Sequence, residues 1–375
     1  MASGDFSATE LGRIKVRLQD IWPKAGEKYD DNEIAKALLN NQTANFEPIM
    51  VGDRCRGAQV SFMKKCSNTI SDCYDDDTPR WEDCDWTGEE GESAVANLDV
   101  DQCISDTFNV KSSECQSNEF GYADRFAFLL ARSLERIQEE LAVRTGIFLN
   151  ANAMTPATPK YGTLNGKVIE FNPADYNRLS IVSKMVYDAR QNDLGTNSVG
   201  ISTGLMWLAQ DLNRRRGGGF GIYTDPTNGI PIYFDRKFNQ LQQALGGEAV
   251  ILFDPDTVAF WTYNYEQSDN WVDKGHSNMH SMRWPLPDLT YQSGGSAQPI
   301  YVDLHRKRVC DGHPSNWMDK YIAMLNFGFA EAPLVCAGDK NRIIKFGANE
   351  SVDPSNEDCC PPVIVNEGGT EGGGG

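Results

Sequence analysis

The sequence lacks the usual marks of a membrane protein and of a nucleic-acid-binding surface. No stretch approaches the roughly 18 apolar residues that a membrane-spanning helix needs. The first 20 residues contain no unbroken apolar run of the kind found in secretory signals. Lysine and arginine total 35 against 53 aspartates and glutamates, which gives a formal net charge of −18. We therefore expect synthesis in the cytoplasm, no membrane partner and no bulk attraction to nucleic acid.

Histidines are few, and their spacing fits a metal site poorly. Only four occur, and His276 and His280 stand four positions apart. Ser277 occupies the place where a zinc protease carries its glutamate, so a loop is the alternative interpretation of this pair. A second group of possible metal ligands consists of His305, Cys310 and His313. The alternative interpretation of these residues is a turn between two strands.

Motifs for phosphate binding and for nucleophilic catalysis are also missing. The segment 214–221, RRRGGGFG, has neither the strand before it nor the helix after it that a phosphate-binding loop requires. There is no GxSxG sequence, and carboxylate pairs are too numerous to discriminate. We expect no catalytic, cofactor-binding or metal residue, and no enzymatic activity.

The ten cysteines lack the CxxC spacing of zinc ribbons and knuckles. Six of them fall in one acidic segment. One interpretation is that they form late disulfides or bind a metal, and the other is that they are unpaired small apolar side chains in a long loop. The redox state of Cys359 and Cys360 stays open. The six clustered cysteines are Cys55, Cys66, Cys73, Cys84, Cys103 and Cys115.

A long one-sided helix is the clearest feature that the sequence does contain. Its apolar residues recur at steps of three and four between Asn118 and Gly146, with Asn118 as a cap and Gly146 as the stop. Such a helix of roughly 27 residues spans about 40 Å, so an extended surface must cover its apolar stripe. The stripe consists of Ala123, Phe126, Ala127, Leu130, Leu134, Ile137 and Leu141.

The residues before this helix predict an arm and a long connection. Residues 11–21 form an amphipathic stretch, 31–40 a short helix and 46–66 a strand. Residues 67–117 are dense in Asp, Glu, Ser and Cys, and we assign no strand to them.

The residues after the helix predict a lobe in which helices and strands alternate. A hairpin over 162–169 has Asn165 and Gly166 as a type I′ turn. Helix, strand and helix follow over 181–189, 199–202 and 205–212.

Further strands are predicted in the second half of the chain. Residues 222–234 read as strand, turn and strand, and the strand over 249–263 is interrupted at Asp254 and Pro255. Two long strands, 299–309 and 321–329, match the helix 118–146 in length. The fold class predicted is α+β.

The order of these elements resembles the major capsid proteins of tailed bacteriophages, the Hong Kong 97-type fold. In that family a spine helix ends in a short Gly/Asn-rich run, similar to 145–150 (TGIFLN) here. An axial lobe then contains a strand with a Gly-ϕ-Pro-ϕ core, similar to 229–232 (GIPI). A glycine-led strand with an aspartate and a nearby aromatic residue follows, similar to 247–254 with Trp261. Peripheral strands end near a proline, as 323–333 does.

The resemblance covers most of residues 30–345 and implies a division of the chain. An N-terminal arm and an extended loop with a Cys-rich acidic insertion precede the spine helix, and an axial α/β domain follows it. In order, the implied parts are the N-terminal arm 1–47, extended loop 48–117, spine helix 118–158, axial domain 159–258, peripheral strands 259–345 and flexible C-terminal tail 346–375.

The resemblance implies a coat protein that assembles into hexamers and pentamers of an icosahedral shell around double-stranded DNA. Its partners would be copies of itself and the enclosed DNA, without sequence-specific contacts, with portal, scaffolding and decoration proteins as further candidates. Its location would be the virion. The alternatives are a tail or baseplate protein, for which we find no β-rich repeats, a Cys-rich surface-binding protein, which would need an export signal, and last an enzyme.

Overall fold

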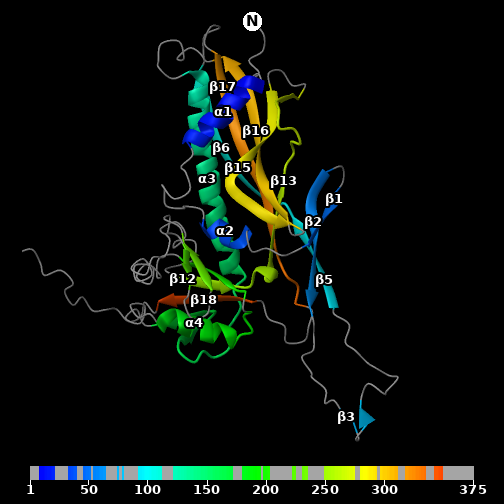
Figure 1. Ribbon diagram of the computed structural model, residues 1–375, viewed down its shortest axis with the longest axis vertical. Coiled ribbons are helices and arrows are strands. Elements are labelled where there is room, and N and C mark those ends of the chain that lie inside the picture. Colours follow the sequence, from blue (N-terminus) through cyan, green and yellow to red (C-terminus); the bar gives the residue numbers. More distant parts are fainter. Residues whose placement is uncertain are drawn as a thin grey trace, which may run out of the picture.

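Helices and sheets combine in an elongated molecule whose longest elements share one direction (Figure 1). These are helix α3 (Tyr122–Ala151) and strands β15 (Met279–Ser293), β16 (Ser296–Cys310) and β17 (Trp317–Glu331). The mixed class predicted from the sequence is confirmed. The computed structural model describes residues 8–21, 33–39, 45–51, 54–64, 74–75, 78–79, 92–111, 121–171, 180–195, 197–202, 222–224, 230–234, 249–274, 279–293, 296–310, 317–334 and 342–348.

The long helix is confirmed, but its start differs from the predicted one. It begins at Tyr122, and Gly121 caps it in an extended conformation without a side-chain hydrogen bond. The predicted cap, Asn118, lies outside the described residues. With 30 residues, α3 is about 45 Å long.

The predicted end of the helix at Gly146 is wrong. Gly146 is a buried residue inside α3, which continues to Ala151. Glycine inside a helix costs about 1 kcal/mol relative to alanine. Burial of Leu149 and the stacking of Phe148 on Phe329, with ring centroids 4.8 Å apart, offset that cost.

The six-stranded sheet that faces α3 is built around β17. Strand β16 and then β13 (Val258–Tyr263) pair with one edge of β17, and β6 (Gln102–Lys111) pairs with the other. Strand β15 and the short β14 (Val272–Asp273) extend the sheet beyond β16. The two late strands predicted from the sequence are thus confirmed and are longer than predicted. Strand β15 was not predicted.

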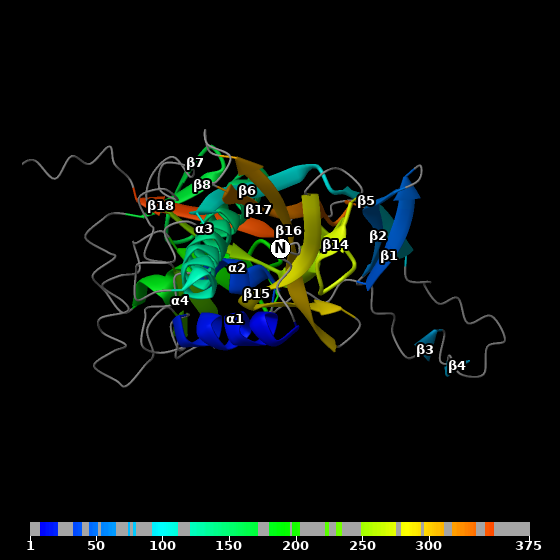
Figure 2. The same ribbon diagram turned by 90° about the horizontal axis from the view of Figure 1, so that it is seen from above.

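A three-stranded sheet extends away from α3 and the six-stranded sheet (Figures 1 and 2). Its last strand runs almost directly into β6, with only Val100 and Asp101 between them. The prediction of no strand within 67–117 is therefore wrong for 92–99 and 102–111, and for the short strands at 74–75 and 78–79. A separate pair, β3 (Tyr74–Asp75) and β4 (Thr78–Pro79), lies farther out. The strands of the three-stranded sheet are β1 (Asn45–Val51), β2 (Arg54–Lys64) and β5 (Glu92–Asp99).

A seven-stranded sheet lies at one end of α3 and has two buried faces. In β12, Val250 and Leu252 pack toward helix α4 (Ser180–Arg190), whereas Ile251 and Phe253 join the core beneath α3. The period-2 alternation of strands explains this division. In spatial order the strands are β10 (Ile222–Thr224), β11 (Pro231–Phe234), β9 (Val199–Ser202), β12 (Ala249–Phe253), β18 (Ile343–Ala348), β8 (Val168–Phe171) and β7 (Thr163–Asn165).

The hairpin of β7 and β8 has a different turn from the predicted one. Asn165 pairs with Val168, so Gly166 and Lys167 are the two central residues. Gly166 has φ +61°, and Lys167 is not among the described residues with positive φ. A type I′ turn needs positive φ at both central residues, whereas type II′ needs it only at the first. The turn is therefore of the II′ kind.

Two N-terminal helices cover the same side of the six-stranded sheet as α3. Helix α1 (Ala8–Ile21) crosses beside α3, and α2 (Glu33–Leu39) lies near the junction with the seven-stranded sheet (Figures 1 and 2). Helix α2 confirms the helix predicted over 31–40, and α1 contains the amphipathic stretch predicted over 11–21. The break between β12 and β13 is confirmed as a short 3-10 helix, η4 (Pro255–Thr257). Predicted elements at 205–212, 214–221 and 225–229 lie outside the described residues.

Candidate functional site

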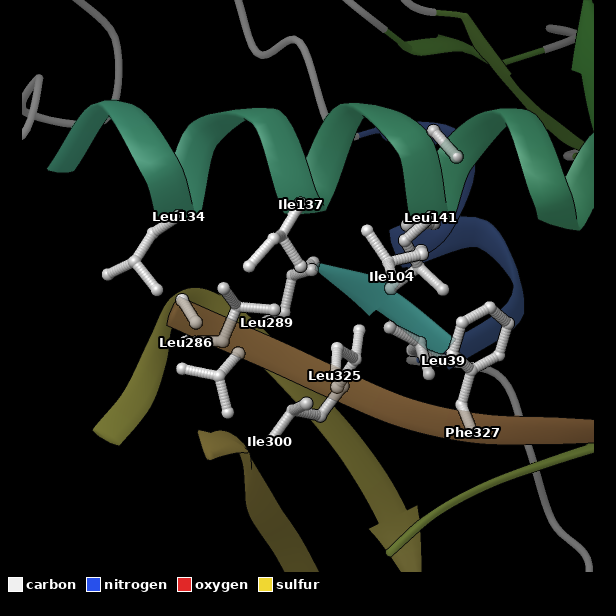
Figure 3. Packing of buried hydrophobic residues seen from close by; sticks show 14 of the residues in the cluster. Leu39, Ile104, Leu134, Ile137, Leu141, Leu286, Leu289, Ile300, Leu325 and Phe327 are labelled. Carbon is white, nitrogen blue, oxygen red and sulfur yellow. The ribbon is translucent and has the colours of Figure 1, made fainter. Parts of the chain in front are cut away.

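The extended surface that covers α3 is formed by the late strands together with β6 (Figure 3). From the helix, Leu134, Ile137 and Leu141 point into this contact, and each is at most 1% exposed. Each fully buried aliphatic side chain contributes about 1.5–3 kcal/mol. We call this contact the α3 wall. The side chains opposite the helix are Ile104, Leu286, Leu289, Ile300, Leu325 and Phe327.

A polar cluster fixes the N-terminal end of α3 to β16 and β17. The Tyr122 hydroxyl donates to Asp319 Oδ2 over 2.5 Å and lies 2.6 Å from the Tyr321 hydroxyl. Arg308 donates from Nε to Asp319 Oδ1 at 3.0 Å, and buried Arg306 donates from Nη2 to Oδ2 at 3.3 Å. The carboxylate therefore accepts bonds from the helix and from the neighbouring strand.

The charges of this cluster set its titration. Burial alone would raise the pKa of Asp319, but hydrogen bonds from Arg308 and Tyr122 and the charge of Arg306 outweigh burial and lower it below its usual value. Burial raises the pKa values of both Tyr122 and Tyr321. The tyrosines thus stay neutral and the aspartate stays charged near neutral pH.

Two further contacts hold the middle and the end of α3. Gln138, fully buried, donates its amide N–H to the carbonyl of Pro287 in β15. Near the C-terminal end, Lys345 Nζ in β18 donates to Asn150 Oδ1 over 2.9 Å, and burial lowers the pKa of Lys345. Helix α3 is therefore attached to the six-stranded sheet at one end and to the seven-stranded sheet at the other.

The three-stranded sheet joins the six-stranded sheet through a close approach at Gly328. A Cβ on this buried glycine would stand 2.1 Å from the carbonyl oxygen of Asp99 and 2.9 Å from a methyl of Leu98. Only glycine lets β17 approach the end of β5 so closely. At the junction, Val60 and Leu98 pack with three buried alanines, and Trp261 packs against this cluster.

A buried carboxylate, Asp303, fastens residues 264–266 to the sheet. Asp303 accepts from the backbone N–H groups of Tyr265 at 2.9 Å and Glu266 at 3.1 Å, and from the amide of Asn326 at 3.3 Å. Burial raises the pKa of Asp303, and the two backbone hydrogen bonds oppose that rise. Lys274 pairs with the buried Glu266 at 2.7 Å, which holds the rest of this connection.

Two aspartates order the connections of the seven-stranded sheet in the same way. Asp188 in α4 is fully buried and accepts from the backbone N–H groups of residues 160–162, at 2.9 Å for Lys160. Asp254 accepts from the N–H of Gly195 at 2.9 Å and from the Ser198 hydroxyl. These carboxylates replace water as partners for backbone groups that turns leave unpaired.

No known family model matches the sequence, and no curated protein matches it. Among solved structures, the chain is similar to one of Mycobacterium phage Adephagia (9% identity, TM-score 0.42, covering 92% of this chain and 98% of that one). It is also similar to the capsid structure of Cyanophage P-SCSP1u (12%, 0.39, 88% and 94%) and to the capsid of a native GTA particle (10%, 0.37, 87% and 95%). The sources of these structures agree with the resemblance stated from the sequence. Identities this low with TM-scores below 0.5 do not by themselves assign a fold or a function.

The structure does not bring the histidine candidates together where it describes them. In the register of β15 and β16, His280 lies opposite Arg306 and Ser281 lies opposite His305, so His280 and His305 are on opposite faces of the sheet. The Ser281 hydroxyl lies 2.8 Å from His305 Nδ1, and Ser281 is fully buried. His276 and His313 lie outside the described residues, and of Cys310 only the backbone is described.

The other candidates fall mostly outside the described residues, including 214–221, Cys359 and Cys360. Of the six clustered cysteines, Cys103 is described with its side chain, which is exposed and free. Within the described ranges no group of three or more His, Cys, Asp or Glu side chains could hold a metal ion. In the same ranges no helix is long and apolar enough to cross a bilayer.

The polar cluster at Asp319 was missed from the sequence, although a signal existed. Arg306 stands in phase with the buried residues of β16, and Asp319 stands in phase with those of β17. A charged residue at a buried position of one strand predicts an opposite charge on its neighbour.

Proposed function

We propose that this chain is the major capsid, or coat, protein of a tailed double-stranded DNA phage. Copies of it assemble into hexamers and pentamers of an icosahedral shell that encloses the genome. The observation that carries the proposal is the α3 wall: a 30-residue helix packed along strands of 15 residues each. This is the arrangement of spine helix and peripheral strands that the Hong Kong 97-type resemblance implies.

The wall supports a shell role because it makes a stiff body out of one chain. Helix α3 is fixed at Tyr122, at Gln138 and at Asn150, so neither end moves freely relative to the two sheets. A subunit of a closed shell transmits strain to its neighbours, and close-packed interiors of this kind resist deformation. The core is continuous from α1 through α3 to β18, which ties the seven-stranded sheet to the same body.

The three-stranded sheet supports the proposal because it extends away from that body (Figure 1). Its outer strand β1 pairs only with β2 in the described part of the chain. A projecting element that lies on a neighbouring copy adds contacts at a high effective concentration. Obligate interfaces of this kind bury thousands of Å² in total.

The proposal divides the chain as the resemblance implies. The axial α/β domain surrounds the symmetry axes of the capsomers, and the arm and the extended loop contact neighbouring copies. The parts are the N-terminal arm 1–47, extended loop 48–117, spine helix 118–158, axial domain 159–258, peripheral strands 259–345 and C-terminal tail 346–375.

In the virion, the chain contacts copies of itself and encloses DNA without sequence-specific contacts, and portal, scaffolding and decoration proteins are further partners. A net charge of −18 fits this role, because an acidic inner wall repels the packaged genome weakly and leaves it free to move. A shell whose inner face is basic would contradict this part of the proposal. No residue is assigned to catalysis, to a cofactor or to a metal.

Negative-stain electron microscopy of the purified full chain tests the proposal. We expect closed shells or rings of five and six copies. Gly328→Val, which disturbs the attachment of the three-stranded sheet, should reduce shells while circular dichroism stays close to that of the parent. Gly12→Ala is the matched control, because no atom lies within 4 Å of its added Cβ, and it should assemble normally.

Other outcomes separate the remaining functions. Monodisperse monomers at all concentrations would contradict a shell protein and would favour a surface-binding protein or an enzyme. Open tubes or stacked discs would favour a tail or baseplate protein. Shells that form equally well from the Gly328→Val variant would leave the shell role in place and remove the proposed role of the three-stranded sheet.

A further inference from the structure

Two exposed tyrosines, an exposed lysine and a half-buried lysine meet on and beside α4, and we call this group the aromatic–lysine patch (Lys160, Tyr161, Lys184 and Tyr187). The two tyrosine rings meet edge to face, with centroids 5.3 Å apart. Lys160 Nζ stands 5.0 Å from the Tyr187 centroid and 5.5 Å from that of Tyr161, and Lys184 Nζ stands 6.0 Å from Tyr161. Tyr161 and Tyr187 are 45% and 41% exposed.

Buried hydrogen bonds hold the two segments that carry the patch in a fixed arrangement. Asp188, one residue after Tyr187 on α4, is fully buried and accepts the backbone N–H groups of Lys160, Tyr161 and Gly162. This bonding fixes the backbone that carries Tyr161 against the helix that carries Tyr187. The result is a preformed apolar surface with positive charge at its margin, which suits a partner that is both acidic and apolar.

The last described residues of the chain lie close to this patch. Ala348, at the end of β18, pairs with Phe171 of β8, and a Cβ on Gly162 would stand 3.4 Å from the ring of Phe171. Gly162 therefore lies on the far side of β8 from Ala348, about two strand spacings or 10 Å away. Helix α4 packs on both β8 and β18, because Phe171 and Phe346 share its apolar cluster (Figure 1).

The chain continues from Ala348 into a segment that is both acidic and apolar, as a partner of the patch should be. Residues 349–375 contain six aspartates and glutamates and no lysine, arginine or histidine. The run 361–365, PPVIV, is apolar and follows Glu357 and Asp358 closely. Nine residues of extended chain reach about 30 Å, so these carboxylates can meet the patch from Ala348.

We propose that the segment 349–375 docks on the aromatic–lysine patch of its own chain. Its carboxylates pair with Lys160 and Lys184, and its 361–365 run covers Tyr161 and Tyr187. Exposed ion pairs are individually weak, but attachment about 10 Å away makes the contact intramolecular and raises its effective concentration to the millimolar range. This inference does not depend on the proposed function, because it concerns contacts within one chain.

Zero-length cross-linking with a carbodiimide, followed by mass spectrometry of the peptides, tests the docking on the full-length protein. The reagent joins a lysine amine to a carboxylate only when the two are in contact. We expect links from Lys160 or Lys184 to acids of 349–375 at a yield at least about fivefold above links from Lys320, an exposed lysine of β17 that serves as internal control.

Charge exchange makes the test specific. The variant Lys160→Glu with Lys184→Glu should lose these links. Adding Glu357→Lys with Asp358→Lys should restore cross-linking, now between lysine amines at 357 and 358 and carboxylates at 160 and 184. Tyr161→Ser with Tyr187→Ser should lower the yield while both lysines remain. Thermal unfolding of each variant checks that the fold is intact.

Three results would overturn the proposal. Equal yields at Lys160, Lys184 and Lys320 would mean that the segment does not dock. Links found only between isotopically light and heavy chains in a mixture would assign the patch to a second copy. Links that disappear when short single-stranded DNA is added, at low ionic strength and at equimolar concentration, would assign the patch to nucleic acid phosphates.

Discussion

The hydroxyl of Tyr122 donates a hydrogen bond to the carboxylate of Asp319 over 2.5 Å, although 197 positions separate the two residues in the chain. Tyr122 is the first residue of α3, and Asp319 lies near the start of β17. The bond joins the first residue of the long helix to one end of a long strand. It therefore fixes the position of α3 along the six-stranded sheet. Beside it, Phe108 stacks on Tyr321 and Phe126 packs on the same ring at a tilt, with centroids 5.0 and 4.8 Å from that ring.

Tyr122→Phe tests this bond with the smallest possible change. The ring keeps its packing, and only the hydroxyl that bonds to a charged carboxylate is lost. We expect the free energy of unfolding to fall by about 1.5–3 kcal/mol. Urea denaturation measures it. Arg136→Gln, which removes an exposed ion pair with Asp106, is the control and should cost less than about 1 kcal/mol. Equal losses in the two variants would contradict the special role of Tyr122.

The lowered pKa of Asp319 predicts how stability depends on pH. A carboxyl whose pKa is lower in the folded protein contributes stability that is complete above its unfolded pKa of about 3.9, and this contribution is lost as pH falls through the lowered value. The difference in unfolding free energy between the parent and Asp319→Asn should therefore be constant above about pH 5 and shrink at lower pH. Denaturant titrations at several pH values measure the difference. A gap that widens in acid would contradict the assignment.

Asp303 should behave in the opposite sense. Burial raises the pKa of this carboxyl, so its contribution is present below about pH 3.9 and is lost as pH rises through the raised folded value. Between those two pH values the parent should gain stability on acidification relative to Asp303→Asn. The same titrations provide the measurement, and identical pH profiles for the Asp303 and Asp319 variants would contradict the opposite directions of the two pKa shifts.

The sequence predicts the elements of the α3 wall well because their periodicities are strong. Apolar residues at steps of three and four from Phe126 to Leu141 predict α3, and the runs that contain Val302 and Leu325 predict β16 and β17. The end of α3 could not be predicted in the same way. Gly146 is a local stop signal, and the buried Leu149 overrides it through contacts that only the folded chain makes.

The polar contacts of the site could be predicted only in part. The phase of Arg306 and Asp319 indicates a buried pair, but nothing in the sequence places Tyr122 beside them. The same holds for Asp188 and for the bond from Gly195 to Asp254, because backbone N–H groups carry no side-chain signature. Strands β5 and β6 were hidden by composition, because small and polar residues such as Cys103, Ser105 and Thr107 occupy the exposed positions of β6 while Ile104 and Phe108 keep the alternation.

The close approach at Gly328 predicts a local effect of adding a side chain there. Valine would place atoms within 3 Å of the backbone of Asp99, and a backbone atom cannot rotate away as a side chain can. We expect β5 to separate from β17, so amide hydrogen exchange in β2 and β5 should accelerate while exchange in α4 stays unchanged. Gly12→Ala should leave exchange in both regions unchanged and stabilise α1 by about 0.5–1 kcal/mol. Faster exchange throughout the molecule would mean that Gly328→Val unfolds the whole chain rather than one junction.

The centre of the α3 wall should be the most sensitive part of the chain to loss of apolar volume. Ile137 is fully buried between Leu134 and Leu141 and faces β15 and β17, so the structure around it has little room to close over a cavity (Figure 3). Ile137→Ala should lower the free energy of unfolding by about 2–5 kcal/mol. Arg132→Ala, on the exposed side of the same helix, shares its helical environment and should change that energy by about 0.5 kcal/mol or less. Chemical denaturation of the two variants at equal protein concentration compares them directly. If Ile137→Ala cost no more than Arg132→Ala, α3 would not be packed on the late strands in solution, and the stiffness on which the proposed shell depends would be lost with it.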